Sequence, residues 1–262
     1  LVRSRGLGDV YKRQGHIDHA LKALFINYGL LTLLILAIGA FFSEDLWWGW
    51  VLMAAAPSAI SVVPFTTILG GETSKALFST ATNYAAALLL MPAITLALIG
   101  SAVSTSSLVY SLLLLIVLPM ILSRGVTRLQ LAKPVSTSLM NVSFAVLIFA
   151  VAGANRDAFV GDPMIVLGVS IGCTVRTFGI GLGTEFALRG LGMPKPSRIS
   201  YVLFSSYKNL GLTATLAIAL FEPVVAVPAT ICIVFEVVWV IFLGRYYTAF
   251  NGTRTVSHSH ET

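Results

Sequence analysis

Four ionisable residues lie inside stretches of the chain that are otherwise apolar: Arg176, Glu185, Lys208 and Glu236. A charged side chain near the middle of a membrane helix costs about 2.5–3.5 kcal/mol on insertion scales, so such residues usually face a cavity or a partner of opposite charge. Groups of this kind bind ions, transfer protons or attract charged solutes. These residues are therefore the first candidates for a functional site.

Lys208 carries the strongest signal of the four. Its ammonium could act as a fixed charge that faces an anionic solute, or as a group that loses its proton during a working cycle, because burial disfavours the charged form of a lysine. The alternative is a structural ion pair with Glu236 or another acid. Arg176 could attract an anion, reach the cytoplasmic headgroups or pair with Glu185.

Two of the apolar stretches are interrupted near their middle. The first contains Pro57 and Pro64, with Ser61 between them, and the second contains Lys208 and Asn209. Proline removes a backbone donor and clashes with the preceding turn, so the first helix should break. Backbone groups freed by a break cannot face lipid and must line a buried or watery cavity. Broken helices near the midplane are typical of transporter sites, although a kink tolerated for packing would leave the same pattern.

Polar side chains also follow the first interruption. Thr80 and Asn83 lie on the next apolar stretch and supply hydrogen-bonding groups at the depth where a solute would bind. Hydrogen bonds of this kind equally hold one membrane helix to another. Both interpretations stay open at this point.

Composition fixes the class of fold. The chain has 262 residues, of which 56% are hydrophobic and 11% charged, against about 25% charged in an ordinary soluble domain. A bilayer core needs about 20 apolar residues per helix. The sequence therefore predicts an all-α, polytopic membrane bundle of about eight spans, two of them discontinuous. The spans are expected at about residues 23–42, 47–69, 74–100, 107–123, 138–154, 163–188, 199–220 and 223–243.

The distribution of charge predicts the orientation of the chain. Lys and Arg are concentrated in the loops and tails on one side of the predicted spans, and Arg156 is the one basic residue on the other side. The positive-inside rule then places both termini in the cytoplasm and the protein in the cell membrane. Because the basic residues lie in short loops, the formal charge of +6 does not indicate nucleic-acid binding.

Motifs for catalysis, metal binding and cofactors are absent from the sequence, so we expect no enzyme, no metal and no cofactor. Cys173 and Cys232 each lie inside an apolar stretch without CxxC or Cys/His spacing. They are expected to be two small buried hydrophobic residues without redox or zinc chemistry.

The two ends of the chain differ from its middle. Residues 1–14 are polar and basic, begin with Leu and are similar to translated adapter sequence, so we interpret them as a non-native leader. A transporter domain is expected over residues 15–246 and a polar cytoplasmic tail over residues 247–262. His258, His260 and Glu261 in that tail are not expected to form a dedicated metal site.

Two segments resemble the bile acid/sodium symporter family. In the first, Pro57 is followed by Gly71-Glu72 and by STATNYAAALLLMP from Ser79 to Pro92. In the second, KNLGL at residues 208–212 is followed by ATLAIALFEPVVAVP, which ends at Pro228. The resemblance covers most of residues 23–243. It implies a ten-helix fold of inverted repeats with two crossing discontinuous helices, and hence that two N-terminal spans are missing.

The chain departs from that family at the sodium ligands. The family holds sodium with a Ser-Asn pair and hydroxyls near the first crossover and with a Glu and a Gln at the second. The resemblance places Val62 and Val63 at the pair, Phe204 at the Glu and Lys208 at the Gln. Valine and phenylalanine offer no oxygen, and an ammonium only donates. We therefore expect the family's fold and site position without its sodium sites, and proton coupling becomes possible.

The expected function is secondary transport of a small organic anion across the lipid bilayer. An arsenite-permease-like efflux carrier is one alternative, because that family is similar at Asn83. Its crossover cysteine would fall near Ser58, so this chain lacks the thiol expected for that chemistry. A non-transporting membrane sensor or assembly protein is the other. The predicted solute-binding residues are Lys208, Asn209, Ser61, Pro64, Asn83 and Thr80, and the predicted ion-coupling or charge-pair residues are Lys208, Glu236 and Arg176.

Overall fold

The computed structural model describes residues 14–100, 104–126, 132–154, 156 and 162–252. All but the last residue of the predicted leader lie outside these ranges, as do His258, His260 and Glu261 of the predicted tail. The last helix continues through Gly252, so the first residues of that tail are helical.

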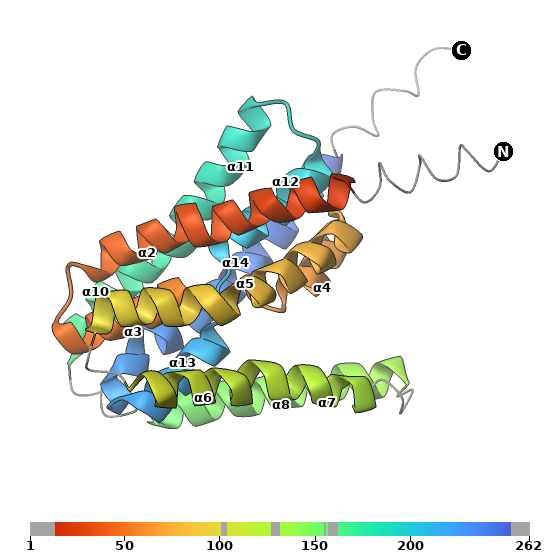
Figure 1. Cartoon of the computed structure of the whole chain (residues 1–262). Coiled ribbons are helices and arrows are strands. Elements are labelled where there is room, and N and C mark those ends of the chain that lie inside the picture. The colour runs from red at the N-terminus through yellow and green to blue at the C-terminus, as the bar shows by residue number, and fades with distance from the viewer. Residues whose placement is uncertain (1–13, 101–103, 127–131, 155, 157–161, 253–262) are drawn as a thin grey trace, which may run out of the picture.

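Every element of the described ranges is helical, as predicted (Figure 1). The first helix, Gln14–Gly39, contains the π-helical segment η1 (Phe25–Leu31) and α2 (Thr32–Gly39). The elements that follow are α3 (Glu44–Ala55), α4 (Val62–Leu69), α5 (Thr73–Ile99), α6 (Thr105–Leu112), η3 (Leu113–Val117), α7 (Leu118–Val126), α8 (Lys133–Ala154), α10 (Pro163–Thr174), η5 (Val175–Gly179), α11 (Ile180–Gly190), α12 (Lys195–Ser206), α13 (Leu210–Leu220), η6 (Pro223–Ala226) and α14 (Val227–Gly252).

Five helices in the described ranges are long and apolar enough to cross a membrane. They coincide with five of the eight predicted windows, while α3–α4, α8 and α12–α13 cover the other three. The number of spans and the inverted repeat stay predictions. The start of the first helix and the end of α14 lie at the same end of the bundle in Figure 1.

Both predicted interruptions are breaks in the helices. α3 stops because Ala56, the residue before Pro57, is extended at ψ 150°, as expected ahead of proline. α12 stops at Tyr207, which is also extended, and Asn209 caps α13 by accepting a hydrogen bond from the main-chain N–H of Leu212. The two breaks meet, because the main-chain N–H of Asn209 donates to the carbonyl of Pro57 at 2.8 Å.

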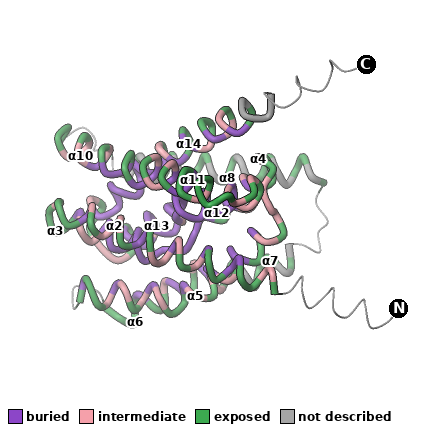
Figure 2. Tube along the Cα trace, turned by 90° about the horizontal axis from the view of Figure 1, so that it is seen from above, coloured by how far each residue is buried: buried purple, intermediate pink, exposed green. Residues whose placement is uncertain are grey.

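The broken helices form the interior of the bundle. α3, α12 and α13 are buried along most of their length, whereas the outer faces of α5 and α6 are exposed (Figure 2). Large apolar side chains such as Leu89 in α5 and Val109 in α6 are exposed on those outer faces, which suits contact with lipid. In Figure 1, α6–α7 and α8 lie along one edge, and α6 and α8 both contact α13.

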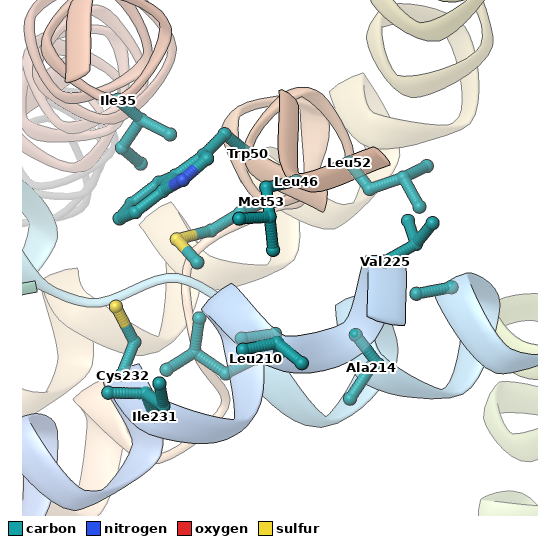
Figure 3. Packing of buried hydrophobic residues seen from close by; sticks show 14 of the residues in the cluster. Ile35, Leu46, Trp50, Leu52, Met53, Leu210, Ala214, Val225, Ile231 and Cys232 are labelled. Atoms are coloured by element: carbon teal, nitrogen blue, oxygen red, sulfur yellow. The ribbon is translucent and has the colours of Figure 1, made fainter. Parts of the chain in front are cut away.

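Apolar packing holds α3 against α13 and α14 (Figure 3). Trp50, Met53, Leu210 and Ile231 belong to one buried cluster at this junction. Close approach here requires glycine, because a Cβ at Gly49 would collide with the carbonyl oxygen of Val225 in η6. Tight packing against η6, α13 and α14 therefore fixes the position of α3, the first half of the first broken helix.

A disulfide joins Cys173 in α10 to Cys232 in α14. Both residues are buried, as predicted, but they are bonded to each other, so the expectation of two small buried hydrophobic residues without redox chemistry was wrong. The cysteines are 59 residues apart, and no local spacing indicates which helices become neighbours. The bond fixes α10 to α14.

Candidate functional site

The Lys208 ammonium lies in a cage of oxygen atoms where the two broken helices meet. Its side chain is fully buried, and its Nζ lies over the Tyr28 ring, 4.5 Å from the centroid. Nζ donates to Asn27 Oδ1 and Thr32 Oγ1, both at 3.1 Å, and to the carbonyl oxygens of Ala54 and Ala56, both at 2.9 Å. An ammonium has three N–H donors, so one of them is shared between two acceptors.

The cage lies at the C-terminal end of α3. The carbonyls of the last turn of a helix have no partner within that helix and carry partial negative charge. Ala54 and Ala56 supply two such carbonyls, and the Lys208 ammonium satisfies both. The C-terminal carbonyls of α3 thus stabilise the Lys208 charge, which would be costly in a membrane interior. In return, the ammonium supplies the hydrogen-bond donors that these carbonyls would otherwise lack.

Asn27 connects the cage to the other broken helix. Its Oδ1 accepts from Lys208, while its Nδ2 donates to the carbonyls of Phe204 and Tyr207 at 2.9 and 3.2 Å. These carbonyls end α12. Asn27 belongs to the π-helical segment η1, and π-helical turns are frequent at functional sites. The Asn27 side chain therefore contacts groups at both helix breaks.

Arg176 and Glu236 form a buried ion pair on the other side of the α12 break. Arg176 Nη2 donates to Glu236 Oε1 at 2.8 Å and to the carbonyl of Ser206 at 3.0 Å. Glu236 Oε1 also accepts from the main-chain N–H of Lys208 at 3.2 Å. Arg176 lies on the π-helical segment η5, so π-helical turns place both Asn27 and Arg176 against the end of α12.

Two pairings considered from the sequence were wrong. The Lys208 side chain does not pair with Glu236, because the chain at the break directs the main-chain N–H toward Glu236 and the ammonium toward Asn27. Arg176 does not pair with Glu185 and does not reach the surface, since it is fully buried against Glu236. Glu185 instead accepts from Arg198 Nε at 3.1 Å and from the Tyr247 hydroxyl at 2.8 Å.

The remaining predicted site residues surround this centre with looser connections. Asn209 Nδ2 donates to the Tyr84 hydroxyl of α5 at 2.6 Å. Thr80 and Asn83 are buried on α5, and within the described part of the chain Thr80 Oγ1 and Asn83 Oδ1 have no hydrogen-bond partner. Ser61 and Pro64 are half-buried at the start of α4, and no hydrogen bond in the described ranges joins them to the Lys208 cage.

The cage residues Asn27, Tyr28 and Thr32 were missed from the sequence. A signal was present, because Asn27 is an isolated amide within the apolar run from Ala23 to Gly39. A polar residue at that depth predicts a partner. The sequence cannot say that the partner is Lys208, 181 residues away.

Comparison with known proteins places the chain in a transporter family. The model of the SBF-like CPA transporter family matches residues 8–246. No curated protein matches the chain. The match confirms the resemblance to bile acid/sodium symporters at the level of the family, and together with the long apolar helices it indicates a membrane protein. Because the match spans most of the sequence, the chain belongs to the SBF-like CPA transporter family.

Proposed function

We propose that this protein is a secondary transporter that moves a small organic anion by alternating access around the two broken helices, without using sodium at the family's ligand positions. Family membership supports the transporter class. The observation that carries the rest is the Lys208 ammonium inside its oxygen cage, at the point where the breaks meet.

The cage has the chemistry of a site for a monovalent cation. Its four acceptors are a side-chain amide, a hydroxyl and two carbonyls, all oxygens and none of them a carboxylate. Hard cations take such oxygen ligands. Here the positive charge is attached to the chain, and a sodium ion could enter this cage only after the ammonium had left it. Lys208 thus takes the role of a resident cation.

The charges around the break favour an anionic solute. Lys208 and Arg176 contribute two positive charges and Glu236 one negative charge, so one net positive charge is buried when all three are ionised. An unbalanced charge in a low-dielectric interior is costly. A net positive site attracts a solute that carries a negative charge.

Thermal unfolding in sodium tests the ion requirement. The purified protein is melted in sodium, potassium and choline chloride at matched ionic strength, and we expect equal melting temperatures. An ion present at 100 times its dissociation constant would stabilise the fold by about 2.7 kcal/mol. A sodium-specific rise in melting temperature would show that the protein binds sodium and would overturn this part of the proposal.

Flux measurements test transport itself. The protein is reconstituted into vesicles and offered a panel of radiolabelled organic carboxylates and sulfonates under imposed pH or sodium gradients. Uptake in sodium-free buffer is the expected result. If no solute moves under either gradient, the transporter proposal fails in favour of a membrane sensor or assembly protein.

A further inference from the structure

Arg176 has more hydrogen-bonding capacity than its surroundings use. Its side chain is fully buried, and Nη2 donates to Glu236 Oε1 and to the carbonyl of Ser206. Nε and Nη1 are buried without a hydrogen-bond partner in the described part of the chain. A guanidinium has five N–H donors, and buried donors are almost always satisfied. The unused donors indicate that a further acceptor binds here.

The Arg176–Glu236 ion pair is a one-point contact. Glu236 contacts the guanidinium through one oxygen and one nitrogen. Arginine usually binds a carboxylate through two parallel hydrogen bonds, which are stronger and more directional. The side chain of Glu236 is 11% exposed and that of Arg176 is 0% exposed. Glu236 is therefore the partner that lies nearer to an accessible surface.

Resting on the proposed transport function, we propose that Arg176 is the binding site for the anionic group of the solute and that Glu236 occupies this place when no solute is bound. The incoming carboxylate displaces Glu236 from Arg176 and makes the two-point contact that Glu236 does not make. The solute class is then an organic carboxylate, or an oxyanion of similar shape.

Displacement couples the anion to a proton. Once Glu236 leaves Arg176, its carboxylate is buried without a cation, and that favours its neutral form. It takes one proton from the aqueous side to which the site is open and returns it when the solute leaves and Glu236 pairs with Arg176 again. Each transported anion is then accompanied by one proton, and the charge of the site is the same before and after binding.

Few other groups can influence this step. Besides Arg176, the Tyr207 hydroxyl donates to the main-chain carbonyl of Glu236, and Lys208 contributes only its main-chain N–H. Of the elements that contact α14, the segments α4, α10, α13 and η6 contain no charged residue. The acids of α3 lie in its first turn and the lysine of α8 begins that helix. Glu185 of α11 and Lys195 of α12 contact α14 at Tyr247, C-terminal to Glu236, and Arg198 pairs with Glu185. The proton is therefore assigned to Glu236.

Anion-dependent thermal unfolding tests this assignment with benzoate as the probe. Wild type, Glu236→Gln and the double variant Arg176→Gln/Glu236→Gln are melted in potassium benzoate and in potassium chloride at mildly acidic and mildly alkaline pH. We expect benzoate to raise the melting temperature of wild type more at acidic pH. Glu236→Gln should respond equally at both pH values and at about tenfold lower benzoate, because the competing carboxylate is gone. The double variant should not respond.

Each departure from this pattern has a definite meaning. A benzoate response that is absent from wild type, or that survives in the double variant, overturns the anion site. A wild-type response that is independent of pH overturns the uptake of a proton by Glu236 on anion binding. If Glu236→Gln does not fold, wild type and the double variant still decide, because the double variant removes both buried charges together. Benzoate binding without flux in vesicles would instead defeat the transport function and leave the anion site standing.

Discussion

Lys208 and Arg176 serve the same purpose at the residue scale, because each brings a positive charge to the carbonyl end of a half-helix. Lys208 donates to Ala54 and Ala56 at the end of α3, and Arg176 donates to Ser206 at the end of α12. Helix C-termini favour cations because the carbonyl dipoles point outward there. The two breaks therefore depend on these side chains for both hydrogen bonding and charge.

Removing the Lys208 side chain should open the cage to external cations. In Lys208→Ala, the buried acceptors lose their donor, which costs about 1–3 kcal/mol for each acceptor left unsatisfied. We expect this variant to melt lower than wild type and to be restored in part by methylammonium or sodium chloride, relative to choline chloride.

Lys208→Met is the matched control for that experiment. Its side chain has similar length but no charge, so it fills the cage and should prevent restoration by added cations. Equal responses of the Ala and Met variants to methylammonium would contradict a cation-specific cage.

At the scale of elements, the predictable and unpredictable parts of the site separate clearly. The breaks were predictable because Pro57, and the polar pair Lys208-Asn209, are local features of the sequence. The Arg176–Glu236 pair and the Asn27–Lys208 contact were not, because they depend on which helices become neighbours. The π-helical segments η1 and η5 add to the difficulty, since an extra residue in a turn changes the face on which Asn27 and Arg176 lie.

The close contact between α3 and η6 gives a prediction for packing. In Gly49→Ala the new methyl group meets the Val225 carbonyl and must push the two elements apart. Overpacking of this kind typically costs about 1–3 kcal/mol. We expect a lower melting temperature in detergent.

Gly183→Ala provides the control for that substitution, because a Cβ at Gly183 in α11 has no neighbour within 4 Å. Alanine is preferred over glycine in a helix by about 1 kcal/mol. Its melting temperature should equal or exceed that of wild type, and a loss as large as that of Gly49→Ala would contradict the packing argument.

At the scale of the whole molecule, the disulfide joins two helices that also carry the charge pair. Cys173 precedes Arg176 by three residues, and Cys232 precedes Glu236 by four, so the bond lies about one turn from the pair on each helix. It fixes α10 and α14 close together and so limits how far Arg176 and Glu236 can separate. The all-helical class and the membrane setting were predictable from composition, but this connection was not.

Breaking that bond should loosen the bundle. Cys173→Ser/Cys232→Ser should melt below wild type, because a crosslink closing a loop of this length contributes up to about 4 kcal/mol in the chain-entropy account. Mass spectrometry of unreduced wild type should find peptides containing Cys173 and Cys232 linked. Two free thiols in freshly purified protein would contradict the bond.

The contact between the two breaks has a mechanical meaning. The N–H of Asn209 holds the carbonyl of Pro57, and the neighbouring Lys208 holds the carbonyls of Ala54 and Ala56. Two helices joined by a single hydrogen bond can rotate about it, whereas a second set of contacts nearby prevents that rotation. In the proposed transport cycle, the Lys208 contacts hold the two half-helices at a fixed angle, and the Asn209–Pro57 hydrogen bond is the point about which they can rotate. Release of the Lys208 ammonium from the cage would therefore let the two broken helices rotate while the Asn209–Pro57 hydrogen bond stays intact.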